Sequence, residues 1–108
     1  MEPNDPKEQL RRWIGAIEYA RYNYVREGIM KCTGITRNAW LRWSRGEGGA
    51  SVPNMIRIAW YAQTHDMPAP FDTIEITDIQ TRNDLVCVIA KVKNAQTDTW
   101  ETRSCLIL

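Results

Sequence analysis

Residues 33–49 read TGITRNAWLRWSRGEGG, and this stretch decides the fold expected for the 108-residue chain. Thr36 is a typical helix N-cap and Gly46 a typical stop, so a helix is expected from Thr36 to about residue 44 or 45. Trp40 and Trp43 lie three positions apart, on one side of such a helix. We expect this side to pack inward, because large aromatic rings belong to cores more often than to surfaces. The arginines of the stretch then face solvent.

Apolar residues at helical spacing predict three further helices around this stretch. One is expected over residues 7–22, capped by Asp5, and a short one over about residues 25–32. Gly28 weakens the short helix by about 1 kcal/mol relative to alanine, and Gly34 is placed to end it with a positive φ. The last helix begins after a cap at Ser51 and ends before the prolines of residues 67–70. Residues 1–6 are expected to form a loose tail or a lead-in to the first helix.

Beyond residue 70 the apolar period changes from 3.6 to 2. The segments DTIEITDI (72–79), DLVCVIAKVK (84–93) and TDTWETRSCLIL (97–108) predict three strands, and residues 82–84 and 93–98 have turn compositions. A sheet this small buries too little on its own, so one face should pack on helices or on a second chain. The expected fold class is α+β, with a four-helix unit over residues 1–67 and a three-stranded antiparallel sheet over residues 71–108.

Charge is distributed unevenly along the chain. The formal net charge is only +1, but residues 1–67 hold ten Lys and Arg against seven Asp and Glu, whereas residues 68–108 hold four against six. Between Lys31 and Arg45 there are four basic residues and no acidic one. This concentration of positive charge favours an anionic partner for the helical part.

The remaining composition argues against several classes of protein. The three cysteines form no C-x-x-C motif and His65 is the single histidine, so neither a disulfide framework nor a metal site is expected. No apolar run approaches the roughly 20 residues that span a bilayer, and the polar start is unlike a signal peptide. The Gly-rich segment 46–51 lacks the Lys-Ser/Thr of a P-loop. We therefore expect a cytoplasmic protein that is not an enzyme and has no cofactor, membrane contact or small-molecule ligand.

The order of residues around the turn resembles the Cro and phage-repressor class of helix-turn-helix proteins, often called the Xre family. The resemblance covers about residues 10–67 and includes SVPNMIRIAWYA (51–62), which is similar to the helix that follows the recognition helix in that family. In the second helix, Met30 stands where the family usually has alanine, and Arg26 stands where it often has glutamine. The residues that carry the resemblance are Gly34, Ile35, Thr36, Arg37, Trp43, Arg45 and Gly46.

The resemblance implies a recognition helix that enters the major groove of DNA, and the residue types agree. Arginine can bond guanine bidentately and asparagine can bond adenine, and the N-terminal residues of a recognition helix contact bases first. Other basic side chains bind phosphate groups, which contributes affinity but no sequence specificity. Candidate base-reading residues are Arg37, Asn38, Leu41 and Arg42, and candidate phosphate-binding residues are Arg26, Lys31, Thr36, Arg45 and Arg57.

The function expected from these features is sequence-specific regulation of transcription, as a repressor of phage, plasmid or bacterial origin. The sheet is the candidate homodimer surface, and a dimer would bind a palindromic operator, associating with the nucleoid when bound. One alternative is an antitoxin or phage-encoded inhibitor whose sheet binds a partner protein while the helices autoregulate its promoter. Another is a nonspecific architectural DNA binder. A basic amphipathic helix can also be a solvated face with no DNA partner.

Overall fold

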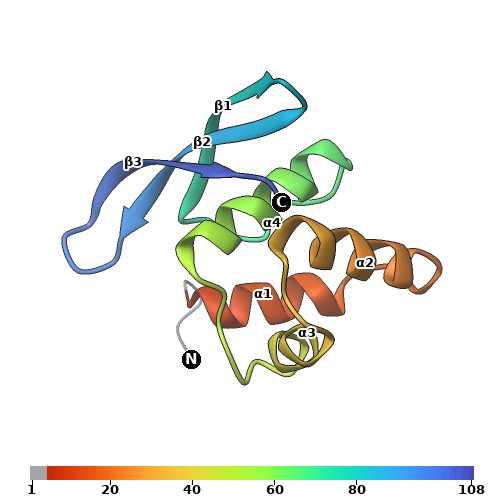
Figure 1. Cartoon of the computed structure of the whole chain (residues 1–108). Helices are drawn as coiled ribbons and strands as arrows, with labels where there is room; N and C mark the ends of the chain where they lie inside the picture. The colour runs from red at the N-terminus through yellow and green to blue at the C-terminus, as the bar shows by residue number, and fades with distance from the viewer. Residues whose placement is uncertain (1–4) are drawn as a thin grey trace.

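Four α-helices precede a three-stranded antiparallel sheet in the computed structural model, which describes residues 5–108 (Figure 1). This α+β arrangement confirms the expected fold class and element order. The tail predicted over residues 1–6 lies mostly outside the described residues. The elements are α1 (Pro6–Gly15), η1 (Tyr19–Arg21), α2 (Tyr22–Thr33), α3 (Arg37–Ser44), α4 (Val52–Thr64), β1 (Ile74–Arg82), β2 (Leu85–Asn94) and β3 (Thr99–Leu106).

Side-chain caps begin three of the helices at the predicted positions. The side chain of Asp5 accepts a hydrogen bond from the backbone N–H of Lys7 at 3.0 Å. Thr36 Oγ1 and Ser51 Oγ accept from backbone N–H groups three residues later, at 3.2 and 3.3 Å. Gly34 ends α2 with φ of 72°, a left-handed conformation that glycine adopts without strain. The local signals of the sequence therefore set these boundaries.

The first helix is shorter than predicted. The apolar spacing indicated one helix over residues 7–22, but α1 ends at Gly15, the backbone at Glu18 is extended with ψ of 138°, and the 3₁₀ turn η1 leads into α2. Ile17 continues the apolar spacing and still packs at the edge of the core, so periodicity alone could not reveal the break. Gly15 is a poor residue for a helix interior, and the chain turns after it to start α2.

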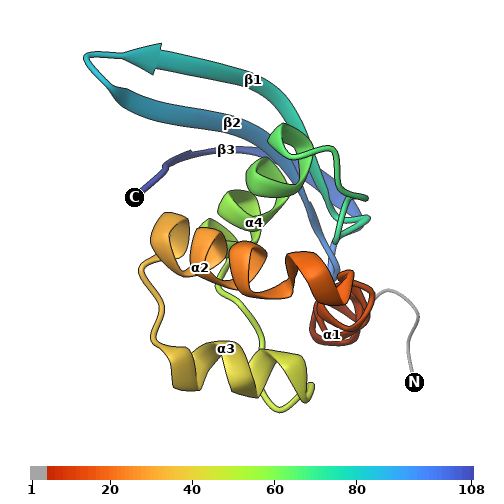
Figure 2. The ribbon, with the colours of Figure 1, turned by 90° about the vertical axis from the view of Figure 1, so that its right-hand side faces the viewer.

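The helix α4 lies at the centre of the molecule, with α2 packed on one side and the sheet on the other (Figures 1 and 2). The helix α3 packs mainly against α1, so α3 and the sheet lie at opposite sides of the protein (Figure 2). One continuous core joins the helices to the sheet. Its largest fully buried side chains are Leu10, Val25, Ile29, Trp40, Ile56, Ile58 and Val88.

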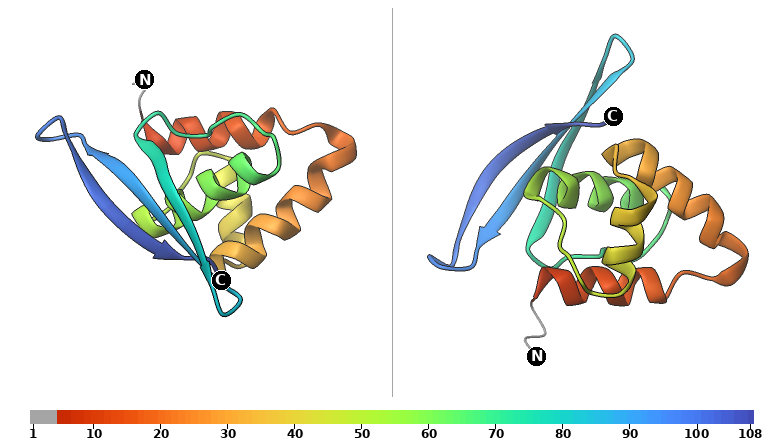
Figure 3. Two further views of the ribbon diagram at one scale, coloured as in Figure 1. Left: turned by 90° about the horizontal axis from the view of Figure 1, so that it is seen from above. Right: turned by 60° about the horizontal axis from the view of Figure 1, so that its bottom comes forward.

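The sheet is a meander in the order β1-β2-β3, and its inner face packs on α4. Ile74, Val88 and Cys105 are buried on this face. The predicted turns are confirmed: Asn83 and Asp84 both have positive φ between β1 and β2, and Asp98 does so between β2 and β3. Figure 3 shows the β1–β2 hairpin reaching beyond the helices.

Long-range hydrogen bonds tie the C-terminal part to the helices. Trp13 Nε1 donates to the carbonyl of Pro68 at 2.7 Å, and Arg57 Nε donates to the carbonyl of Leu106 at 2.8 Å. The backbone N–H of Leu108 donates to the carbonyl of Cys32, where α2 ends. The residues 1–67 and 71–108 thus differ in secondary structure but share a core and these bonds.

Candidate nucleic-acid interface

The helix α3 has one buried face and one open face. Trp40 is fully buried and Trp43 is 5% exposed. Trp40 Nε1 donates a hydrogen bond to the hydroxyl of Tyr22 at 2.9 Å, and the two rings meet edge to face with centroids 6.0 Å apart. This bond satisfies the only polar atom of the indole, so the ring can be buried without an unpaired donor. The two indoles hold α3 on the rest of the helical layer, as the sequence predicted.

The four candidate base-reading residues all lie on the open face. Arg37, Asn38 and Arg42 are exposed, and Leu41 is 38% exposed. Within residues 5–108, the side chains of Arg37 and Asn38 have no hydrogen-bond or ion-pair partner. Arg42 leans toward the loop after α3, where a Cβ built on Gly48 would lie 3.1 Å from its Nη2. The first turn of α3 therefore presents free donors to solvent, and Arg42 presents its guanidinium one turn later.

Two of the candidate phosphate-binding residues flank this open face. Thr36 caps the start of α3 and is exposed, so its hydroxyl can still donate while it accepts from Ala39. Arg45 follows the end of α3, with Nη1 3.8 Å from Glu47 Oε2. Both groups in this pair are more than half exposed, and such a pair contributes little and opens readily. The structure thus brings Thr36 and Arg45 together with the base-reading candidates.

The other three candidate phosphate-binding residues lie outside α3, and two of them already have protein partners. Arg26 is 16% exposed and its Nη2 donates to Glu27 at 3.2 Å. Lys31 lines a hollow of about 380 Å³ between α2 and α4, and no residue of α3 lines that hollow. Arg57 donates from Nη1 to Asn54 Oδ1 at 2.8 Å, besides its bond to β3. These side chains would have to leave their protein partners, or reach across the surface, to meet a duplex on α3.

The sequence reasoning missed the position of Arg11. Its side chain lies against Gly46 at the end of α3, where an added Cβ would be 3.1 Å from Arg11 Cδ. Arg11 and Arg12 both donate to the buried carboxylate of Glu8. The Arg11 hydrogen bond holds the pKa of Glu8 below its usual range. The spacing of three and four residues between these groups was the available signal. Part of the positive charge near α3 is therefore neutralised.

Burial makes two of the cysteines poor nucleophiles. Desolvation raises the pKa of Cys32 to about 11 and also raises the pKa of Cys105. Because the thiolate is the reactive form, both thiols stay protonated and inert near neutral pH. Cys105 instead donates to the carbonyl of Pro53, and the residues behave as small apolar members of the core.

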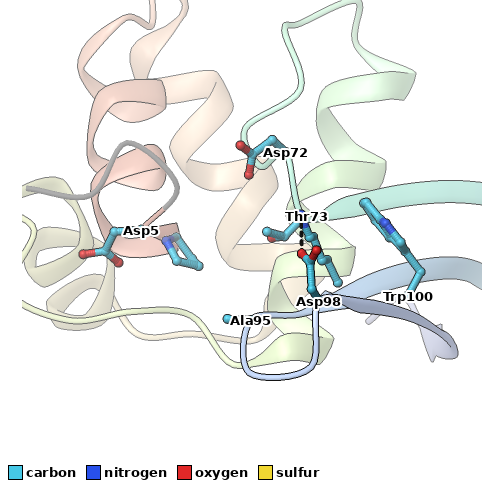
Figure 4. Close-up of a pocket in the computed structure, with 8 residues that line it drawn as sticks. Asp5, Asp72, Thr73, Ala95, Asp98 and Trp100 are labelled. Atoms are coloured by element: carbon cyan, nitrogen blue, oxygen red, sulfur yellow. Dashed lines mark ion pairs between the residues drawn. The ribbon is translucent and has the colours of Figure 1, made fainter.

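A second hollow, of about 500 Å³, lies where the β2–β3 turn approaches the start of α1 (Figure 4). Asp5, Asp72 and Asp98 line it, and Asp98 is ion-paired with Lys93 at 2.9 Å. Trp100 forms one wall. Its lining carries three aspartates against one lysine, and this net negative charge would repel phosphate, in contrast to the positive open face of α3.

Three comparisons with known proteins bear on identity: no protein-family model, curated protein or solved structure matches this chain. Over residues 5–108, no helix is long and apolar enough to cross a membrane. In the same range, no three His, Cys, Asp or Glu side chains cluster closely enough to hold a metal ion.

Proposed function

We propose that this protein binds double-stranded DNA through α3 and regulates transcription, as a homodimeric repressor of phage, plasmid or bacterial origin. The observation that carries the proposal is the division of α3 into two faces. Trp40 and Trp43 are buried, while Arg37 and Asn38 project freely from the first turn. A recognition helix needs this division, because one face must be fixed on the scaffold while the other meets base edges.

The residue types on the open face suit direct readout in the major groove. Arg37 can bond the O6 and N7 atoms of guanine, and Asn38 can bond the N6 and N7 atoms of adenine. Leu41 offers an apolar contact for a thymine methyl group, and Arg42 is a second candidate guanine reader. Each good bidentate contact discriminates against a wrong base by about 1–3 kcal/mol. The pattern thus favours sequence choice over purely nonspecific binding.

Phosphate contacts would supply most of the affinity and all of its salt dependence. Thr36 and Arg45 flank the open face and are the first candidates. Arg26, Lys31 and Arg57 are second candidates, since each is engaged elsewhere or lies off α3. We infer a modest number of phosphate contacts and therefore a shallow dependence of affinity on salt.

Selection from random DNA duplexes, read at two salt concentrations, tests the proposal. A specific regulator enriches one motif at both concentrations, because base contacts survive when phosphate contacts weaken. A nonspecific architectural binder enriches no motif and loses its binding steeply with salt. Absence of binding at the lower salt concentration would remove α3 as a DNA-binding helix.

The exposed apolar side chains of the sheet favour a second candidate function. Leu85, Trp100 and Leu106 are 57%, 44% and 50% exposed, all on strands remote from α3. An antitoxin or inhibitor would use this surface to hold a different protein, with α3 serving autoregulation. A pull-down with the full chain, followed by sedimentation of any complex, distinguishes the two. The repressor proposal requires that the partner be a second copy of this chain.

A further inference from the structure

The hydroxyl of Tyr61 is a buried polar group without a partner. Tyr61 is 3% exposed, and among residues 5–108 no hydrogen bond reaches its Oη. Burial raises the pKa of this hydroxyl above its usual range, so it keeps its proton and remains a donor near neutral pH. Folded proteins pair nearly all buried hydroxyls, because an unpaired one loses its hydration without compensation. Phenylalanine at this position would fill the same space without that cost.

Gly28 makes room for the Tyr61 ring and adds a second cost at the same place. A Cβ at position 28 would lie 2.4 Å from Tyr61 Cε2 and 2.6 Å from Tyr61 Oη, so a larger residue would push the ring away from α2. Glycine is a weak helix former, and Gly28 lies inside α2. A weak helix position and an unpaired hydroxyl therefore coincide between α2 and α4.

The hollow of about 380 Å³ between α2 and α4 includes both of these residues in its lining. The two helices lie side by side (Figure 2), and the volume is in the range of small-molecule sites, about 300–1,000 Å³. Aromatic rings form much of the wall. Tyr61 and His65 are stacked with centroids 3.8 Å apart, Tyr24 meets His65 edge to face at 6.3 Å, and Trp60 lines the same hollow. Such walls suit a flat aromatic ligand, because rings pack on rings by stacking and by edge contacts.

The charges around the hollow favour an anionic group on the ligand. Lys31 lines the hollow and is exposed, and within residues 5–108 its ammonium has no hydrogen-bond or ion-pair partner. Glu27 also lines the hollow, but its carboxylate already pairs with Arg26 at 3.2 Å. The charge of Arg21 acts on the Tyr61 hydroxyl as well and favours negative charge there. The charge left without a partner is therefore positive.

We propose that this hollow binds a small aromatic carboxylate, with its ring against Trp60 and His65 and its carboxylate between Lys31 and the Tyr61 hydroxyl. Gly28 and Lys31 are three residues apart and therefore neighbours on one face of α2, so the ammonium can reach a group bound beside Gly28. A carboxylate only accepts hydrogen bonds, which matches two unused donors.

The ligand can reach the covered hydroxyl from the side of Tyr24. This side chain is 66% exposed and lies four residues before Gly28, on the same face of α2. Its ring can therefore turn aside without disturbing the core. The inference goes beyond the DNA binding proposed for α3 and does not depend on it, because no residue of α3 lines the hollow.

Titration of the full chain with 2-naphthoate, followed by two-dimensional NMR without DNA, tests the site. Saturable shifts should appear at the residues of α2 and α4 that line the hollow. The charge-reversed probe 2-naphthylmethylammonium should bind roughly tenfold more weakly, because it offers no acceptor to the two donors. Octanoate, which has the carboxylate but no ring, should also bind more weakly. Absence of saturable shifts, shifts centred on another surface, or tighter binding of the cation would overturn the proposal.

Two substitutions separate the proposed contacts from a structural role. Tyr61→Phe should raise the Kd of 2-naphthoate about fivefold or more, while the midpoint of urea unfolding stays unchanged or rises, because an unpaired hydroxyl is removed. Lys31→Ala should raise the same Kd and reduce the preference for the anionic probe over the cationic one. Tyr19→Phe and Lys91→Ala are the matched controls, since both residues are exposed and lie outside the hollow, and they should leave the Kd unchanged.

The behaviour of Tyr61→Phe decides the inference. A variant that binds 2-naphthoate like wild type would remove the hydroxyl from the site, and a lowered unfolding midpoint would show that the hydroxyl already has a partner within the protein. Either result would overturn the proposal. Because every measurement is made without DNA, failure of the probe to bind leaves the proposed function intact, and failure of α3 to bind any duplex leaves this inference intact.

Discussion

The surfaces of α3 and β3 carry charge in different ways. The open face of α3 presents Arg37 and Arg42 with no acidic residue among its neighbours on the helix. The edge of β3 presents Glu101 and Arg103 together. A surface of one sign repels its own copy and needs an anionic partner of another kind, whereas a surface with both signs in a fixed order can recognise itself. We therefore expect a polyanionic partner for α3, and the sheet remains the candidate homodimer surface.

Tryptophan substitution should give the largest difference between the two regions. Trp40→Ala removes a fully buried ring and leaves the hydroxyl of Tyr22 without its hydrogen-bond donor. It should therefore lower the free energy of unfolding by about 3–5 kcal/mol. Trp100 is 44% exposed, and Trp100→Ala should cost about 1 kcal/mol or less in the monomer. Urea unfolding at low protein concentration measures both. Equal costs would mean that Trp40 is not the anchor of α3.

Arginine substitution should separate the two partners. Arg37→Ala should weaken binding to the selected DNA motif by about 1–3 kcal/mol and relax preference at one base position, with the dimer Kd unchanged. Arg103→Ala should weaken the dimer and leave base preference intact, because it touches no base. Fluorescence anisotropy on matched and mismatched duplexes measures the first effect and sedimentation the second. An unaltered preference in Arg37→Ala would contradict the assignment of α3 as the reader.

The smallest effect is expected at the margin of the α3 surface. Lys31→Ala should weaken binding to all duplexes alike and reduce the slope of log affinity against log salt by about one unit at most. Lys31 lies in the hollow between α2 and α4 rather than beside α3, so Arg45→Ala should reduce the slope at least as much. Titrations at four salt concentrations compare the two. A sequence-selective loss in Lys31→Ala would contradict its role as a phosphate contact.

The parts of the fold that depend on neighbours in sequence could be predicted. Thr36 caps α3 and Gly34 ends α2 because each acts on backbone groups within a few residues. The burial of Trp40 and Trp43 followed from their spacing on one helix. The break after Gly15 could not be predicted, since Ile17 keeps the apolar spacing through the turn.

The parts of the fold that depend on contacts between distant residues could not be predicted from the sequence. Gly28 looked like a defect in a helix, but the ring of Tyr61, 33 residues later, packs so closely that an added Cβ would lie 2.4 Å from it. Arg57 is a predicted phosphate contact, and nothing in the sequence indicated that its guanidinium also donates to a carbonyl 49 residues away. In the candidate site, the open face of α3 was foreseeable from its own residues. The bond from Arg57 to β3 was not, because that partner is set by packing.

The bond between Arg57 and the carbonyl of Leu106 has a further consequence for a symmetric dimer. It fastens β3 to α4, and the bond from Leu108 to Cys32 fastens the same strand end to α2. A dimer joined through the sheet would therefore hold its two α3 helices at a nearly fixed separation. Inserting one base pair between half-sites displaces them by about 3.4 Å and turns them around the duplex axis. Such a dimer would tolerate almost no change in the spacing between half-sites of the operator. Removing the hydrogen bond from Arg57 to Leu106 would widen the range of spacings that the dimer accepts.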